Sequence, residues 1–285
     1  MKFRYQLILL FALIIACNNR HSPKQVVLNS DSIKKDSVKG ELGDSLYKIK
    51  MLAFALDYAN KNKDKDSFLY KSEQLTIDSG SISMDYGYLF DKQHKHLIIR
   101  IPPIDTPYVH LTDPISIYLY VLKENRFVLL CSQTVDSLGG LDIMGAYQGD
   151  TLRDINGDGC KDFVVNWYSG NGCCPRAENH IFFYNSDNGT VTSEFDLMNT
   201  TFLPDKKIVY LMDYGFPGTI AMYKCEWRGI KLDTIESVST NSSHRNMFDI
   251  ENEATGKIKT VRGLPKEYRC IDKSELDWFL SAWEK

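Results

Sequence analysis

The stretch from Asp154 to Val165 reads Asp-Ile-Asn-Gly-Asp-Gly-Cys-Lys-Asp-Phe-Val-Val. Side-chain oxygens recur at every second residue in Asp154, Asn156 and Asp158. A further carboxylate follows at Asp162, after a sharp turn that Gly159 permits. A hard cation such as Ca²⁺ takes about six to eight oxygen ligands, and calcium loops supply them at this spacing. The stretch therefore predicts a cation-binding turn between two segments of regular structure.

The residues that follow the turn separate this loop from an EF-hand. The twelfth position is Val165 instead of a bidentate glutamate, and Phe163–Val165 has the composition of a strand. We expect the carbonyl oxygen of Cys160 to join the side-chain ligands. The predicted ligands are Asp154, Asn156, Asp158, Cys160 and Asp162. The alternative is an Asx-rich turn between two strands that holds no metal.

The pattern Asp-x-Asn-x-Asp-Gly-x-x-Asp-Phe-x-Val resembles the calcium loop of FG-GAP/VCBS-type repeats. This resemblance covers about a dozen residues and implies a structural Ca²⁺ ion. Propellers of that family carry several such loops, whereas this chain has one. A complete seven-bladed propeller is therefore not expected.

Around the loop, the chain after Ser67 is rich in aromatic and β-branched residues, in short segments separated by turns. The expected strands are Phe68–Tyr70, Gln74–Ile77, Ile82–Phe90, Leu97–Ile101, Ile115–Leu122, Phe127–Val135, Phe163–Tyr168, Ile181–Tyr184, Val191–Phe195, Ile208–Met212, Ile220–Trp227 and Leu232–Val238. Hairpin turns are expected at 123–126 and 186–189. The pattern predicts a mainly β fold, an antiparallel meander arranged like a propeller or a sandwich.

One helix is expected at each end of this β-rich body. The first runs from a cap at Asp44 or Ser45 to Asn62. Its predicted core face is Leu46, Ile49, Leu52, Ala53, Leu56 and Ala59. The second runs from Ser274 to Trp283. Residues 44–285 are expected to form a single globular domain, with the calcium loop at 154–162.

The N-terminus resembles a bacterial lipoprotein signal. Basic Lys2 and Arg4 precede an apolar run that ends in Ile14-Ile15-Ala16-Cys17. The resemblance implies cleavage after residue 16, lipidation of Cys17 and anchoring in the outer membrane, because Asn18 takes the place of the aspartate typical of inner-membrane retention. A plain secretory signal is the alternative. Residues 17–43 are polar and are expected to form a tether. Three Asp-Ser-aliphatic triplets at 31–33, 36–38 and 44–46 resemble O-glycosylation acceptors.

Six cysteines besides Cys17 suggest disulfides in an oxidising compartment. They are Cys131, Cys160, Cys173, Cys174, Cys225 and Cys270. Their fifteen possible pairings stay open, and one guess joins Cys160 to Cys173 or Cys174. A metal or redox site at 172–175 is the alternative, although the chain has no Cys-x-x-Cys motif.

The formal net charge of −3 and the lack of a basic block argue against nucleic acid as a partner. No nucleophile, zinc-protease, phosphate-loop or dinucleotide motif is present, so catalysis is uncertain and the sequence favours a non-catalytic protein. An acid–base pair could come from Asp113, Asp142, Asp150, Asp196 and Glu226. His94 and His96 are a further candidate metal pair.

The leading hypothesis is a non-catalytic, calcium-braced binding module tethered in the bacterial envelope. Its layout also resembles envelope lipoproteins that inhibit, or give immunity against, peptidoglycan hydrolases. The resemblance implies a protein partner such as a lysozyme-like enzyme, and a glycan is the other candidate ligand. The candidate ligand surface is Trp167, Tyr168, Asn171 and Arg176. The alternatives are an envelope polysaccharide or peptidoglycan hydrolase that uses paired carboxylates, and a purely structural lipoprotein.

Overall fold

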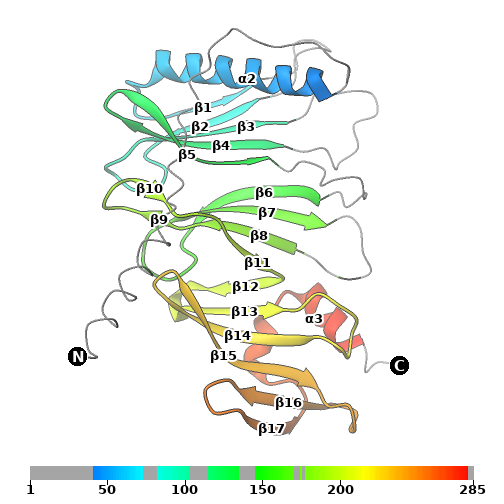
Figure 1. The fold of residues 1–285 in the computed structure, drawn as a ribbon. Helices are drawn as coiled ribbons and strands as arrows, with labels where there is room; N and C mark the ends of the chain where they lie inside the picture. The colour runs from blue at the N-terminus through cyan, green and yellow to red at the C-terminus, as the bar shows by residue number, and fades with distance from the viewer. Residues whose placement is uncertain are drawn as a thin grey trace, which may run out of the picture. The chain divides into compact units, whose positions relative to one another are not determined.

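A computed structural model describes residues 41–72, 82–102, 115–134, 145–169, 174 and 177–281. All of them belong to one compact unit, Gly40–Lys285 (Figure 1). The predicted signal peptide, Cys17 and most of the tether lie outside the described residues. Within the described residues, no helix has the length and apolarity needed to cross a lipid bilayer.

Among the described residues, the unit contains three antiparallel sheets of four or more strands and one two-stranded sheet. The N-terminal sheet contains, in spatial order, β1 (Phe68–Lys71), β2 (Ser83–Gly87), β3 (His96–Ile101), β4 (Ser116–Lys123) and β5 (Arg126–Thr134). The middle sheet has the order β11 (Phe195–Met198), β8 (Ala177–Phe182), β7 (Asp162–Ser169) and β6 (Gly145–Arg153). A small hairpin, β9 (Tyr184–Asn185) with β10 (Thr190–Val191), lies between β8 and β11 in the chain.

The C-terminal sheet is the largest, with six strands in sequence order. They are β12 (Thr200–Leu203), β13 (Ile208–Met212), β14 (Ala221–Arg228), β15 (Lys231–Thr240), β16 (Met247–Asn252) and β17 (Lys257–Arg262). Short 3₁₀ turns, η1 (Pro204–Lys206) and η2 (Lys266–Cys270), follow β12 and β17. Helix α2 (Glu41–Asn62) precedes the sheets and α3 (Lys273–Leu280) follows them.

The sheets pack face to face, because alternate residues of a strand point to opposite faces. In β7, Phe163 and Val165 pack on the N-terminal sheet, whereas Val164 packs on the C-terminal sheet. In β13, Val209 packs on the middle sheet, and Tyr210 packs in the cluster that contains α3. The middle sheet is thus buried between two other sheets, and α2 and α3 cover the two outer ones.

An ion-pair network joins the N-terminal and middle sheets beside this apolar core. Arg100 on β3 donates to Asp150 on β6 at 2.5 Å and to Asp85 on β2 at 2.6 Å. Tyr147 also donates to Asp150. The Asp150 side chain is almost fully buried, so the bidentate pairing with Arg100 compensates for the cost of desolvating its charge.

The predicted fold class is confirmed: the protein is mainly β, with antiparallel sheets and a helix near each end. The turn at 123–126 joins β4 to β5, with positive φ angles at Glu124 and Asn125 as in a type I′ hairpin. Among the described residues, four strands were not predicted. They are Gly145–Arg153, Thr200–Leu203, Met247–Asn252 and Lys257–Arg262. The predicted strand Gln74–Ile77 lies outside the described residues, and the predicted strand Val191–Phe195 is divided between β10 and β11.

The prediction for the inward face of the first helix is partly correct, since Leu52, Leu56 and Ala59 do pack on the sheet. Leu46, Ile49 and Ala53 are exposed, and the side chains that pack on the sheet include Tyr47, Ala55 and Ala59. The small alanines let the helix backbone approach the sheet. Tyr58 then meets Phe68 edge-on and Tyr70 at a tilt, with ring-centroid distances of 5.5 and 4.6 Å. At the other end, α3 begins at Lys273 with Asp272 as its cap, not Ser274.

Candidate metal-binding sites

The predicted calcium loop connects β6 to β7 and lies where the middle and C-terminal sheets meet. Ile155 is fully buried in the apolar cluster that contains Val209 and Trp227 of the C-terminal sheet. The Asn156 side chain donates to the carbonyl oxygen of Gly229 in the β14–β15 turn at 3.2 Å. The loop therefore contacts two sheets and is not a free surface turn.

Within the loop, acidic side chains accept hydrogen bonds from nearby backbone N–H groups. Asp154 accepts from Gly157 and Gly159 at 2.6 and 2.9 Å. Asp158 accepts from Cys160 at 2.7 Å and from the Asn156 amide at 3.1 Å. These Asx turns fix the backbone in the compact form that a calcium loop requires, and they also fit a turn without metal.

Asp162 is the most buried of the loop carboxylates, with no exposed surface. Its two oxygens accept from the backbone N–H groups of Ile155 and Tyr184, each at 3.0 Å. Burial raises the pKa of Asp162 to about 7. The two hydrogen bonds oppose this rise, and the negative charges of Asp158 and Asp154 add to it. The ionised form of Asp162 is thus disfavoured at this dehydrated position, and a bound cation would favour it.

The donor chemistry of the loop fits a hard cation, because carboxylate and amide oxygens are the ligands that Ca²⁺ takes. Each carboxylate oxygen of Asp154, Asp158 and Asp162 accepts one hydrogen bond and keeps a lone pair for a metal. In the described part of the chain, however, these three residues do not bring ligand atoms within 4.8 Å of one another. The side chains would have to converge to complete a calcium site.

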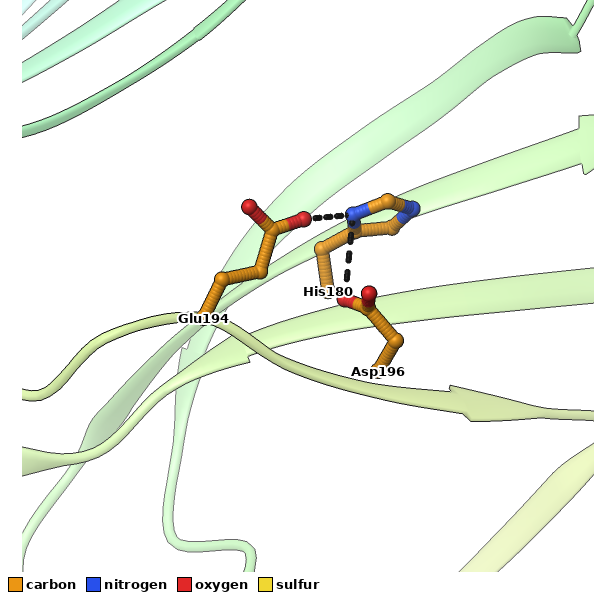
Figure 2. A group of neighbouring side chains, drawn as sticks. All are labelled: His180, Glu194 and Asp196. Atoms are coloured by element: carbon orange, nitrogen blue, oxygen red, sulfur yellow. Dashed lines mark hydrogen bonds and ion pairs between the residues drawn. The ribbon is translucent and has the colours of Figure 1, made fainter.

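A second cluster of possible metal ligands does have its ligand atoms within 4.8 Å of one another. The sequence alone did not group these residues together. His180 on β8, Glu194 before β11 and Asp196 on β11 bring one ligand atom each within 4.8 Å of one another (Figure 2). His180 Nδ1 contacts Glu194 Oε1 and lies 3.2 Å from Asp196 Oδ1. Only Asp196 had been a candidate, as a general acid or base.

The charges in this second cluster act on one another. Burial alone would lower the pKa of His180, but hydrogen bonds to Glu178 and Glu194 and the charge of Asp196 raise it above its ordinary value. Burial raises the pKa of Asp196, the charge of His180 lowers it, and the charges of Glu194 and Glu178 raise it further. The net effect is a raised pKa for both groups.

The predicted pair of His94 and His96 does not form a metal site. His96 is fully buried, and its ring nitrogens lie 3.1 Å from the carbonyl oxygen of His94 and 3.4 Å from that of Gly189. Burial lowers the pKa of His96 to about 4. His94 Nδ1 instead contacts Asp91 at 2.8 Å, and Tyr184 donates to the same carboxylate.

The other candidate carboxylates are dispersed. Asp150 is neutralised by Arg100. Glu226 lies on β14 opposite Ile208 and Asp233, away from any described metal cluster. Asp113 and Asp142 lie outside the described residues.

The predicted ligand surface is partly wrong. Trp167 is 4% exposed and packs in the core between the N-terminal and middle sheets, because its position on β7 points inward. Tyr168, the next residue, points the other way and is 43% exposed. Asn171 and Arg176 lie outside the described residues.

The guess that Cys160 pairs with Cys173 or Cys174 is wrong in this structure. Cys131, Cys160, Cys225 and Cys270 all carry free thiols. Cys174 is disulfide-bonded, and because those four thiols are free, none of them is its partner. Cys160 instead donates its backbone N–H to Asp158 within the loop.

Comparison with known proteins gave no match: no protein-family model, no curated protein and no solved structure corresponds to this chain.

The two loop glycines provide a matched test of the contact between the sheets. Both have positive φ, +72° at Gly157 and +88° at Gly159, so alanine at either position costs about 1–2 kcal/mol in backbone strain. At Gly157 the added Cβ would also lie 2.2 Å from the carbonyl oxygen of Pro204, whereas nothing lies within 4 Å at Gly159. We expect Gly157→Ala to lower the free energy of unfolding by about 1–3 kcal/mol more than Gly159→Ala does, measured by urea unfolding. Equal losses would contradict this close contact.

Proposed function

We propose that this protein is a non-catalytic binding module, braced by a calcium ion in the 154–162 loop and tethered in the bacterial envelope. The position of that loop is the observation that carries the proposal. Asn156 bonds to the β14–β15 turn, and Gly157 lies against Pro204 before β13. An ion held there would fix the middle sheet against the C-terminal sheet.

Calcium suits this role because the loop supplies oxygen donors and an excess of negative charge. The charges of Asp154 and Asp158 both raise the pKa of the buried Asp162. A divalent cation would offset that repulsion and replace the water that the buried carboxylate has lost. Its contribution would be structural: it stabilises the native state by binding to that state alone.

The N-terminal sequence supports the proposed location. The Ile14-Ile15-Ala16-Cys17 segment supports lipidation of Cys17 and an outer-membrane anchor. The polar stretch 17–43 would then hold the folded unit away from the lipid surface.

The partner proposed is an envelope protein, such as a peptidoglycan hydrolase, or a glycan. Tyr168 is exposed at the end of β7, the strand that leaves the calcium loop. Tyr214 and Phe216 are also exposed, in the connection between β13 and β14. Exposed aromatic side chains support contacts with either a protein or the face of a sugar ring.

The calcium part of the proposal is tested by calorimetric titration and thermal melting of the chelator-treated chain. We expect wild type to bind one Ca²⁺ per loop and to gain about 2.7 kcal/mol of stability at a hundredfold excess over Kd. Asp158→Ala should lose both responses. Asp187→Ala, in the exposed β9–β10 turn, is the matched control and should behave as wild type. If wild type neither binds calcium nor gains stability from it, the loop is an Asx-rich turn without a metal.

The binding part is tested with two defined probes, isolated peptidoglycan sacculi and purified lysozyme, each with Ca²⁺ or chelator. We expect co-sedimentation with sacculi or inhibition of lysozyme, stronger with Ca²⁺ and reduced at least several-fold in Tyr168→Ala. Val128→Ala, at a similarly exposed apolar position on β5, is the control. If the chain instead degrades sacculi and Asp196→Asn abolishes that turnover, the hydrolase alternative replaces the binding module.

A further inference from the structure

Four polar side chains form a small array on one face of the middle sheet. Glu178 and His180 are two residues apart on β8, and Glu194 and Asp196 have the same spacing at β11. The β8–β11 register places Asp196 directly opposite His180. Because residues two apart share a face of a strand, all four side chains project on the same side.

The array lies at the margin of the interface between the N-terminal and middle sheets. On the adjacent strand, Val165 pairs with His180 and Trp167 pairs with Glu178, and both β7 residues belong to the core between the two sheets. β11 is the edge strand of the middle sheet. One side of the array therefore packs against the core. The other side is exposed to solvent, since the Asp196 side chain is 65% exposed.

Three ligand atoms converge at this margin. Figure 2 shows the carboxylates of Glu194 and Asp196 directed at the same imidazole nitrogen, His180 Nδ1. The second ring nitrogen, Nε2, lies 3.7 Å from Glu178 Oε2. Metal-binding histidines commonly have this arrangement, in which one nitrogen binds the ion and the other faces a carboxylate that orients the ring.

A further polar residue from the opposite sheet supports the array. Gln133 on β5 is 8% exposed, and its side-chain nitrogen donates to Glu194 Oε1 at 2.7 Å. Its side-chain oxygen accepts from the Trp167 indole at 3.4 Å, which fixes the orientation of the amide. Glu194 is thus held in place by a buried partner instead of moving freely at the surface.

The charge of the array is unbalanced. Within the described residues, the ion pairs of Glu194 and Asp196 are formed with His180 and with no lysine or arginine. Even a protonated imidazole supplies one positive charge against two carboxylates. A divalent cation would match these two carboxylates, with the imidazole as a neutral ligand.

We propose that His180, Glu194 and Asp196 form a second metal site, which binds a divalent first-row transition ion of the zinc type. The ligands are His180 Nδ1 and one oxygen from each carboxylate, and water completes the coordination on the exposed side. An imidazole nitrogen with carboxylate oxygens selects zinc and its neighbours over calcium, which takes oxygen alone. This site is independent of the 154–162 loop.

The competing explanation is an ion-paired histidine without a metal, in which protonated His180 itself holds the two carboxylates. The two explanations differ in a measurable way: a metal site takes up one ion, and its affinity depends on His180. If His180 is only an ion-paired histidine, replacing it leaves the zinc affinity of the protein unchanged.

The test uses the full chain, purified without a polyhistidine tag and stripped with chelator. Zn²⁺ is titrated by calorimetry, and Co²⁺ is titrated by its visible absorption, with wild type compared to His180→Ala and Asp196→Asn. We expect one ion at this site in wild type and at least about tenfold weaker binding in both variants. His244→Ala, at an exposed histidine in the β15–β16 turn, and Asp158→Ala, in the calcium loop, should keep the wild-type zinc affinity.

Two results would overturn the proposal. One is that wild type binds no zinc, or that Asp196→Asn leaves the zinc affinity unchanged. The Asp196 side chain is exposed, so this variant keeps the core intact even if His180→Ala fails to fold. The other is a thiolate-to-cobalt charge-transfer band, which would place the ion on one of the free cysteines.

Discussion

The middle sheet packs on another sheet through both of its faces, and the rest of the structure depends on this double burial. Alternate residues of β7 point to opposite sides, so Phe163 and Val165 contact the N-terminal sheet while Val164 contacts the C-terminal sheet. Burial of apolar surface stabilises the folded state by about 25 cal/mol for each Å² of apolar surface removed from water. It also forces the polar ends of these strands into dehydrated positions. The full burial of Asp162, the first residue of β7, is a direct consequence.

The two candidate metal sites lie at the margins of the two sheet interfaces. The 154–162 loop lies beside the core between the middle and C-terminal sheets, and the His180 cluster lies beside the core between the N-terminal and middle sheets. Their donors differ, since the loop supplies only oxygens and the cluster adds an imidazole nitrogen. The proposed roles differ accordingly, with calcium in the loop and a zinc-type ion at His180.

Local patterns in the sequence predicted the parts of the fold that depend on neighbouring residues. The turn at 123–126 and most of the strands follow from β-branched and aromatic runs between turn residues. β6 was missed because its Tyr-Gln-Gly-Asp-Thr segment is polar, and its pairing with β7 is what makes it a strand. The face of α2 was predicted only in part because the helix also carries exposed apolar residues such as Leu46 and Ile49, and only packing against the sheet shows that Tyr47 and Ala55 are buried instead. The calcium loop is contiguous in sequence and could be recognised. The His180 cluster combines Glu-x-His on β8 with Glu-x-Asp at β11, and neither short pattern indicates a site until the strand register is known.

We propose that an ion in the 154–162 loop holds the middle and C-terminal sheets together. Hydrogen exchange of the full chain, with and without Ca²⁺, tests it most directly. We expect slower exchange at the amides of Ile155, Gly157 and Tyr184, which donate to the loop carboxylates, and in β13 and β14, which pack against the loop. We expect no change in β3 and β4 of the N-terminal sheet. If calcium leaves exchange in the loop unaltered, or slows exchange equally in all three sheets, the ion does not hold these two sheets together.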